Sequence, residues 1–361
     1  MGKMHDTATQ KERAIIVAVA FNKTNVNFDD ELEELASLCY TANLEVVGKA
    51  FQNIKEQNPS TLLGSGKVEE IATLVTALDA DVVVVDAELT GSQLNNISNA
   101  CKVKVIDRSM LILDIFAMRA KTNEGRLQVK LAQLKYTLPR VSSISGTAGR
   151  FGSGGVGMRG PGETKLEMDK RVIRESIAKL EKDIVKLKSQ RLIQKNERKK
   201  NNVKQVAIVG YTNAGKSTLM NTITKAGIYA DDLLFATLDT TSRTLYLEPG
   251  KKVVLVDTVG FIDKLPHAFV QAFNATLEET ADADLLIHVV DISERNYKDK
   301  MQVVEDVLHE IHADQIPRIV VYNKVDKIDK PFIVPDNAVL ISAKTNTNLE
   351  ALKAKIIETL F

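Results

Sequence analysis

Eight consecutive residues match the pattern of a phosphate-binding loop: Gly210, Tyr211, Thr212, Asn213, Ala214, Gly215, Lys216 and Ser217. They follow the hydrophobic run KQVAIV, typical of a buried strand, and they open the helical pattern KSTLMNTI, as a Walker A loop requires. Glycines let successive backbone N–H groups face a phosphate, and a helix N-terminus adds partial positive charge. We therefore expect Lys216 to bind the β- and γ-phosphates and Ser217 to ligate Mg²⁺.

A second motif lies 41 residues after Lys216, directly after the strand pattern VVLV, and consists of Asp257, Thr258, Val259 and Gly260. An aspartate at this place can hold a water molecule on Mg²⁺, and the Gly260 N–H can contact the γ-phosphate. The motif is weak alone and gains force from its position after another strand. We expect it to change conformation with the nucleotide state.

A third motif would read the base. It follows the strand pattern RIVVY and consists of Asn323, Lys324, Val325 and Asp326. The Asp326 carboxylate can accept hydrogen bonds from guanine N1 and N2, a donor pair that adenine lacks, so this residue would select GTP. We expect Asn323 to bind N7 and Lys324 to lie along the base. After the strand pattern AVLI come Ser342, Ala343 and Lys344, which would bring the Ala343 N–H near guanine O6.

Between the first two motifs lies a segment with several candidate switch threonines. The predicted nucleotide contacts in it are Phe235, Ala236, Thr237, Leu238 and Asp239. Thr237 is our choice for closing on Mg²⁺ and the γ-phosphate, and Thr240 and Thr241 compete with it on spacing alone. Lys216, Thr237 and Gly260 are thus the predicted catalytic residues, and Ser217 and Thr237 the predicted metal ligands.

Phe261 stands where many GTPases have a glutamine that orients the attacking water. A phenyl ring cannot hydrogen-bond that water. We therefore expect slow hydrolysis by the isolated protein, with a bound partner completing the site.

Two other places resemble sites and are interpreted as structural. The run Leu63–Lys67 (LGSGK) lacks the first glycine of a Walker loop, so a tight turn that caps the helix after Lys67 is the preferred interpretation. Asp86, Glu88 and Asp107 lie at expected strand ends, and we interpret them as turn and cap residues.

Strand and helix patterns alternate on both sides of a charged middle segment. Expected strands before it are 14–21, 44–51, 81–86 and 103–106, with helices at 29–40, 68–78, 92–101, 110–120 and 127–136. Expected strands after it are 204–209, 243–247, 253–256, 285–290, 316–322 and 338–341, with helices at 216–225, 267–280, 298–312 and 348–360. Such alternation indicates mostly parallel α/β sheets, and ligands bind at the carboxyl ends of their strands.

The middle segment combines glycine with positive charge. Residues 146–162 hold 8 of the 19 glycines, and residues 140–204 carry 17 Lys and Arg against 7 Asp and Glu in a chain of net charge +1. Residues 166–200 have a helical pattern with one narrow apolar stripe, which indicates an arm whose partner is the helix at 127–136. Basic residues beside a glycine-rich loop favour RNA contact, while a solvated charged helix with a glycine linker is the alternative.

Composition excludes several protein classes. Hydrophobic residues make up 44% and charged residues 26% of the 361 residues, as in globular proteins. No apolar run reaches the roughly 18 residues that a membrane span needs, and the N-terminus lacks the apolar segment of a signal peptide. Cys39 and Cys101 form no pairing pattern, so we expect reduced thiols and a cytoplasmic location.

These motifs resemble those of the HflX family, in the Obg–HflX class of GTPases. The resemblance rests on GGVGMRGPGETKLE at 154–167, GYTNAGKSTL, LFATLDTT, DTVGFIDKLPH, VIDR at 105–108 and EGRLQV at 124–129. It implies that Thr237 is the switch threonine and that a hydrophobic residue belongs at position 261. Lys130 and Lys165 depart from the family pattern, and many members extend beyond the equivalent of Phe361.

The resemblance implies a fold of class α/β in three parts: an N-terminal α/β domain at 1–140, a glycine-rich loop and helical hairpin arm at 141–202, and a doubly wound P-loop domain at 203–361. It also implies a Mg²⁺-dependent GTPase that binds the large ribosomal subunit and its rRNA, with ribosome splitting, rescue or biogenesis as the outcome. We expect a monomer. The alternative is a scaffold that binds RNA or protein with GTP as a structural ligand, and a metabolic phosphotransferase fits poorly.

Overall fold

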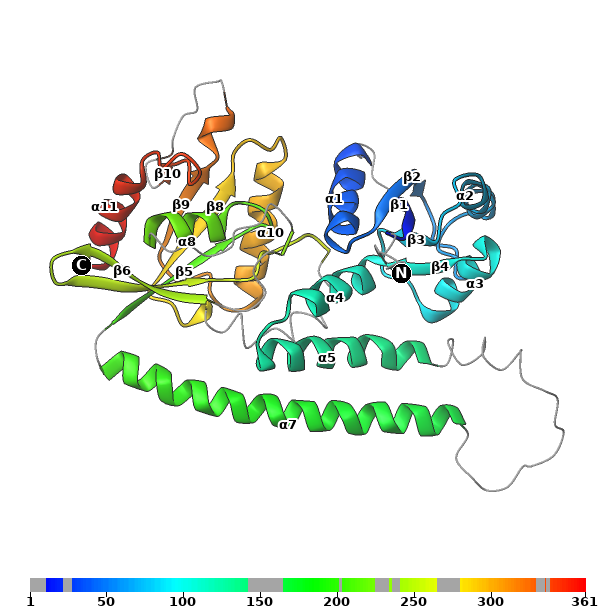
Figure 1. The fold of residues 1–361 in the computed structure, drawn as a ribbon, viewed down its shortest axis with the longest axis horizontal. Helices are drawn as coiled ribbons and strands as arrows, with labels where there is room; N and C mark the ends of the chain where they lie inside the picture. The colour runs from blue at the N-terminus through cyan, green and yellow to red at the C-terminus, as the bar shows by residue number, and fades with distance from the viewer. Residues whose placement is uncertain are drawn as a thin grey trace, which may run out of the picture. The chain divides into compact units, whose positions relative to one another are not determined.

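The computed structural model describes residues 11–21, 28–141, 165–200, 203–224, 234–235, 241–264, 280–328, 335 and 338–361 (Figure 1). The chain forms two compact units. The first is built from Met1–Ile115 and Gln133–Ile177, and the second from Phe116–Ala132 and Ala178–Phe361. No helix among the described residues is both long and apolar enough to cross a lipid bilayer.

The first unit contains a parallel four-stranded sheet of order β2-β1-β3-β4. Its strands are β1 (Arg13–Phe21), β2 (Glu45–Ile54), β3 (Val82–Val85) and β4 (Lys104–Asp107). The helices that alternate with them are α1 (Phe28–Thr41), α2 (Ser65–Ala77) and α3 (Gly91–Cys101). The alternation predicted from hydrophobic periodicity is therefore confirmed here.

Both faces of this sheet are covered. Ile15, Val17 and Val19 of β1 are buried in one core with Ile71 and Val75 of α2. The intervening residues of β1 are also buried, and α1 buries a stripe of its own consisting of Leu32, Leu35 and Leu38. A strand buried on both faces reads as a continuous apolar run, which explains the segment AIIVAVA.

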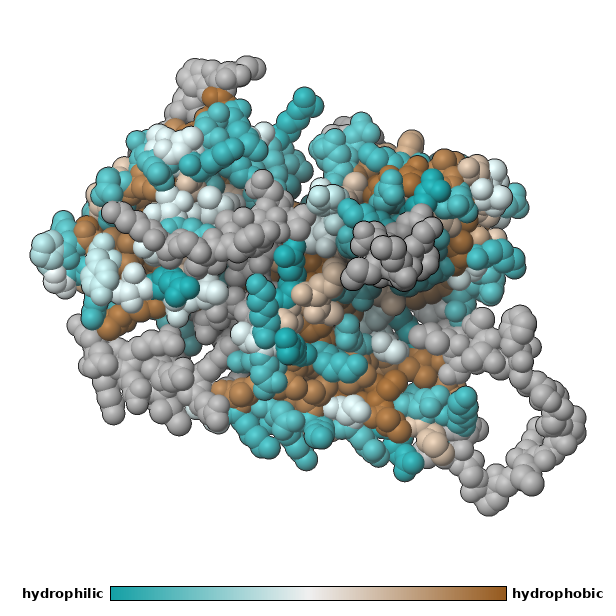
Figure 2. Space-filling view, viewed as in Figure 1, coloured by the Kyte–Doolittle hydropathy of each residue, from teal (hydrophilic) through white to brown (hydrophobic). Residues whose placement is uncertain are grey.

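Four helical segments connect the two sheets: α4 (Arg108–Arg119), α5 (Asn123–Thr137), the short η1 (Leu138–Arg140) and α7 (Lys165–Lys200). The predicted apolar stripe of α7 is confirmed, because Ile184 is buried while Val172 and Val185, which lie off the stripe, are exposed. The other residues of the stripe are partly buried: Leu166, Ile173, Ile177, Leu180 and Leu187. In Figure 2 the coloured part of α7 is mostly hydrophilic along its lower margin. Both α5 and α7 contribute residues to each compact unit.

The second unit contains a six-stranded sheet of order β10-β9-β8-β5-β7-β6, in which only β6 is antiparallel to its neighbour. Its strands are β5 (Lys204–Gly210), β6 (Thr241–Glu248), β7 (Lys251–Asp257), β8 (Leu285–Asp291), β9 (Arg318–Asn323) and β10 (Ala338–Leu340). Its helical segments are α8 (Lys216–Thr224), α10 (Tyr297–Glu310), η2 (Val325–Lys327) and α11 (Leu349–Leu360). Of the helix predicted at 267–280, all but Thr280 lies outside the described residues.

The parallel strands bring their four carboxyl-terminal residues to one edge of this sheet. Strands β5, β7, β8 and β9 end at Gly210, Asp257, Asp291 and Asn323. Behind this edge, Val206, Ile208, Leu255 and Ile287 belong to a common buried core. The α/β class predicted from the sequence is confirmed, and the sheet edge is where its motifs meet.

Candidate nucleotide-binding site

The loop between β5 and α8 depends on two glycines. Gly210 has a φ of +153° and Gly215 one of +93°. A Cβ atom on Gly210 would lie 2.3 Å from the Val289 carbonyl oxygen, and one on Gly215 would lie 2.3 Å from Asn323 Nδ2. Both positions thus need glycine for backbone conformation and for space.

Lys216, the first residue of α8, points back into this loop. Its ammonium group donates hydrogen bonds to the carbonyls of Gly210 at 3.0 Å and Tyr211 at 2.8 Å. The side chain is buried, and burial lowers the pKa of Lys216 to about 8, while Asp257 raises that pKa and Lys324 lowers it. The Lys216 ammonium therefore lies among the loop carbonyls, and on nucleotide binding it can donate to phosphate oxygens in their place.

Ser217 and Asp257 lie together at the ends of α8 and β7. The Ser217 hydroxyl donates to Asp257 Oδ2 at 2.8 Å, and Asp257 is 1% exposed. Strand β5 positions both, since it pairs with β7 and leads through the loop into α8. A hydroxyl and a carboxylate are oxygen ligands of the kind that Mg²⁺ prefers, so these residues fit a magnesium ion.

The segment after Asp257 lies against the loop. Phe261 N–H donates to the Gly210 carbonyl at 3.1 Å, and Thr212 N–H donates to the Phe261 carbonyl at 2.8 Å. Thr258 is turned inward, where its hydroxyl donates to the Ile208 carbonyl, and Val259 and Phe261 are buried. The backbone of this segment therefore faces the loop, while the Thr258 hydroxyl points into the protein.

The predicted base-reading residues are tied to the phosphate loop. The Asn323 amide donates to the Ala214 carbonyl at 2.9 Å and accepts from Ala343 N–H at 3.0 Å. Lys324, which has a φ of +64°, donates to the Asn213 carbonyl at 2.8 Å. Asn323 thus joins three chain segments at one point.

Asp326 is held by Ser342, whose hydroxyl donates to Asp326 Oδ1 at 2.6 Å. This hydrogen bond is the largest cause that keeps the pKa of Asp326 below its ordinary value, and Lys344 and Lys327 act in the same direction. Ser342 in turn accepts from Thr345 N–H at 3.1 Å. The carboxylate is anionic at neutral pH and its exposed oxygens can accept hydrogen bonds.

The structure places the other predicted contacts less completely. Val325 begins η2 beside Asp326, and Phe235 is buried with its ring centroid 4.7 Å from that of Phe116. The predicted contacts Ala236, Thr237, Leu238 and Asp239 lie outside the described residues, as does the competitor Thr240.

Sequence reasoning missed Asp291, which ends β8 and lies 2.7 Å from the Lys324 ammonium. An acidic residue after the buried run LLIHVV was the available signal. It also missed the Tyr211 hydroxyl, which accepts from Asp263 N–H at 2.9 Å. That contact has no sequence signal, because it depends on how two loops approach each other.

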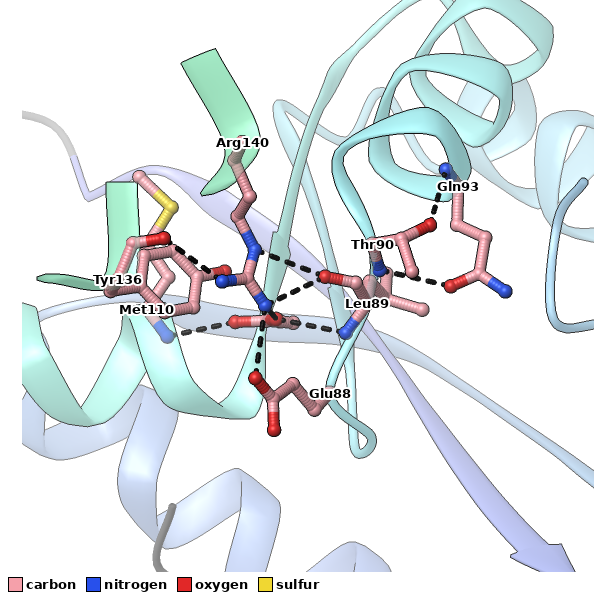
Figure 3. Close-up of polar contacts among 8 residues, drawn as sticks. Glu88, Leu89, Thr90, Gln93, Met110, Tyr136 and Arg140 are labelled. Carbon is pink, nitrogen blue, oxygen red and sulfur yellow. Dashed lines mark hydrogen bonds and ion pairs between the residues drawn. The ribbon is translucent and has the colours of Figure 1, made fainter. Parts of the chain in front are cut away.

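Of the three acidic residues interpreted as turn and cap residues, Asp107 caps a helix, whereas Asp86 and Glu88 form ion pairs. Asp107 caps α4 by accepting from Met110 N–H at 2.8 Å, and it also accepts from Leu89 N–H at 3.0 Å (Figure 3). Arg140 forms an ion pair with Glu88 at 3.1 Å and donates to the Leu89 carbonyl, and Asp86 pairs with Arg108 at 2.7 Å. Burial raises the pKa of Asp107, although its hydrogen bonds from Leu89 and Met110 and the charge of Arg140 act in the opposite direction.

The run LGSGK is also structural in this unit, with one difference from the prediction. Gly64 is the N-cap of α2, and the helix already begins at Ser65, ahead of Lys67.

Three family models match successive stretches of the chain. Family models match at residues 29–117 ("GTP-binding GTPase N-terminal"), 119–198 ("GTP-binding GTPase Middle Region") and 205–324 ("50S ribosome-binding GTPase"). The GTPase HflX of Caldanaerobacter subterraneus subsp. tengcongensis is 49% identical over 99% of this chain and 83% of its own length. The GTPase HflX of Escherichia coli K12 is 42% identical over 99% of this chain and 85% of its own length.

Among solved structures, the chain is similar to a GTP-binding protein from the hyperthermophilic archaeon Sulfolobus solfataricus in complex with GDP. The identity is 25% and the TM-score 0.50, and the match covers 96% of this chain and 98% of the archaeal one.

Proposed function

Because the chain belongs to the HflX family of GTPases, we propose that the sheet edge described above is its GTP site and that the nucleotide state controls binding to the large ribosomal subunit. The chain is a GTPase. The relatives that carry this name match nearly its whole length, and the matching family model at 205–324 is described as a 50S ribosome-binding GTPase.

One observation carries the assignment of the site: the phosphate loop and the predicted base-reading residues are joined by direct hydrogen bonds. Asn323 contacts both Ala214 and Ala343, and Asp326 presents an anionic carboxylate next to Ser342. In this proposal, residues 210–217 hold the phosphates, residues 323–326 and 342–344 hold guanine, and the predicted contacts at 235–239 complete the site.

Ser217 and Thr237 are the proposed protein ligands of Mg²⁺, with Asp257 holding one of its waters. Bound there, the ion would neutralise charge on the phosphates that Lys216 also contacts. The oxygen atoms of Ser217 and Asp257, 2.8 Å apart, support this assignment. Lys216 stabilises the developing negative charge, and the Gly260 N–H would contact the γ-phosphate.

We further propose that a partner completes catalysis. Phe261 is 3% exposed and has no group that could orient water. The large ribosomal subunit is the proposed partner, reached through the basic residues at 141–204, with ribosome splitting, rescue or biogenesis as the consequence; Arg140 is buried and is not among them. The three functional parts proposed for the chain remain 1–140, 141–202 and 203–361.

The test is GTP turnover by the purified protein with and without large ribosomal subunits. We expect slow basal turnover that the subunits increase strongly, and loss of that activity in Lys216→Ala. Full-speed turnover without subunits would refute partner activation. Tight GTP binding with no stimulation would instead favour a scaffold that uses GTP as a structural ligand.

The choice of base is tested separately with Asp326→Asn. An asparagine replaces an acceptor by a donor, so it should weaken GTP binding about 100-fold, as expected for two hydrogen bonds to a charged group. The same variant should gain binding of xanthosine triphosphate, whose base carries a carbonyl where guanine has its amino group. Unchanged GTP affinity would remove Asp326 from the site.

A further inference from the structure

Tyr211 connects the phosphate loop to the segment that follows Gly260. Tyr211 is 6% exposed, and its hydroxyl accepts the hydrogen bond from Asp263 N–H at 2.9 Å. The Lys300 ammonium lies 4.7 Å from the centroid of its ring and also pairs with Glu294. The ring is therefore fixed from the α10 side while its hydroxyl holds the opposite loop.

Two backbone hydrogen bonds reinforce this connection. Phe261 donates to Gly210 and accepts from Thr212, so the residues around Tyr211 and Phe261 pair like a short parallel ladder. We call the three hydrogen bonds that join 210–212 to 261–263 the Tyr211 latch. Its members are Phe261 N–H to Gly210, Thr212 N–H to Phe261, and Asp263 N–H to Tyr211.

The closed latch brings Gly260 against the loop. A Cβ atom on Gly260 would lie 2.9 Å from Thr212 Cα and 3.0 Å from Lys216 Nζ. A phosphate group is much larger than a methyl group, so none fits between Gly260 and Lys216 in this conformation. Thr212 N–H is also occupied, since it donates to the Phe261 carbonyl.

The diphosphate and the triphosphate therefore make different demands on the latch. The phosphates common to both nucleotides would displace the Lys216 hydrogen bonds to the loop carbonyls. Only the third phosphate needs the space beside Gly260, where the proposed function places its contact. Opening the latch is consequently a cost of binding GTP that GDP does not share.

We infer that Tyr211 is a specificity-determining residue that makes the protein favour GDP over GTP, by holding residues 261–263 on the phosphate loop. This inference rests on the proposed function of the site. The Tyr211 hydroxyl would thus discriminate between a diphosphate and a triphosphate, a role separate from the recognition of guanine.

The test compares Tyr211→Phe with wild type, using GDP and β,γ-imido-GTP in equilibrium titrations with Mg²⁺. The variant loses one hydrogen bond of the latch and keeps the ring beneath Lys300. We expect its affinity for the triphosphate analogue, relative to GDP, to rise about fivefold, the order of one neutral hydrogen bond. GDP affinity should change less than twofold. Tyr246→Phe, at a side chain 75% exposed on β6, is the matched control and should change neither.

Hydrogen exchange at the Asp263 amide supplies a second measurement. In wild type this amide should be protected with GDP and exchange faster with β,γ-imido-GTP, and in Tyr211→Phe it should exchange fast with both. If Tyr211→Phe left the ratio of the two nucleotide affinities unchanged, the inference would be overturned while the proposed function stayed intact. If wild type bound neither nucleotide, the proposed function itself would fail.

Discussion

Lys324, which follows β9, forms an ion pair with Asp291 at the end of the neighbouring strand β8, with Nζ 2.7 Å from Oδ2. The same ammonium donates to the Asn213 carbonyl, and Asp291 is fixed by the N–H and hydroxyl of Ser293. Asp291 is 8% exposed, so the pair is largely shielded from water. Lys324 therefore joins the base-reading segment both to the end of β8 and to the phosphate loop.

Replacing Asp291 by asparagine should therefore weaken nucleotide binding without changing nucleotide choice. The substitution keeps the shape and removes the charge, so Lys324 loses a charge-assisted hydrogen bond and GTP and GDP affinities should both fall about tenfold. Isothermal titration checks this, with the exposed Asp299→Asn as control. A change for one nucleotide only would contradict the argument.

Two glycines provide a matched pair for the geometry of the loop. Gly215 and Gly250 have similar positive φ values, +93° and +84°, but a Cβ on Gly250 meets nothing within 4 Å. Gly250→Ala should introduce only backbone strain, which should lower the free energy of unfolding by about 1–2 kcal/mol. Gly215→Ala should in addition displace Asn323, whose amide is fixed by two hydrogen bonds, and abolish measurable nucleotide binding.

Thermal unfolding and titration with GDP separate the two effects. If Gly215→Ala bound GDP as tightly as Gly250→Ala does, the close approach of Asn323 to this loop would not matter for binding.

Ser342→Ala should change the pH at which Asp326 titrates. The Ser342 hydroxyl is the main cause that lowers the pKa of Asp326, so its removal should raise that pKa towards the ordinary value of about 3.9. A lowered pKa in the folded protein means that the charged carboxylate stabilises the folded state. This contribution to stability is complete above a pH of about 3.9 and is lost as the pH falls below that value. In the variant the two pKa values lie closer together, so this contribution to stability should be smaller and its loss should be complete at a higher pH.

A carboxyl ¹³C NMR titration measures the shift directly. The Asp314 carboxyl, whose pKa is lowered chiefly by Gln315, should titrate alike in both proteins. An Asp326 titration identical in wild type and variant would exclude Ser342 as the cause.

Arg140→Met should destabilise the first unit. The guanidinium donates to the carbonyls of Leu89 and Tyr136, pairs with Glu88 and stacks 3.7 Å above the Tyr136 ring. Its loss leaves nearly buried acceptors without a donor, which should cost about 3 kcal/mol of unfolding free energy. Chemical denaturation measures this, with the exposed Arg174→Met on α7 as control. A loss below about 1 kcal/mol would indicate that water replaces the guanidinium.

The sequence was sufficient to predict where most described strands and helices lie, because buried parallel strands and amphipathic helices have different periodicities. It also placed Gly210, Asp257 and Asn323 at strand ends on one edge of a sheet. The antiparallel direction of β6 also had a signal, because the two residues between β6 and β7 are too few for the crossover that parallel strands need. Asp291 and the Tyr211 hydroxyl were missed because their roles arise from contacts between segments 33 and 52 residues apart.

The split of each compact unit into two stretches of chain bears on the order in which the protein can fold during synthesis. The first unit is complete once Ile177 has been made, whereas residues 116–132 belong with a unit whose remaining residues start at Ala178. Val129 and Leu131 are 3% and 4% exposed in the finished protein. On the nascent chain these side chains are therefore exposed to water or bound by a chaperone until residues after Ala178 have been translated.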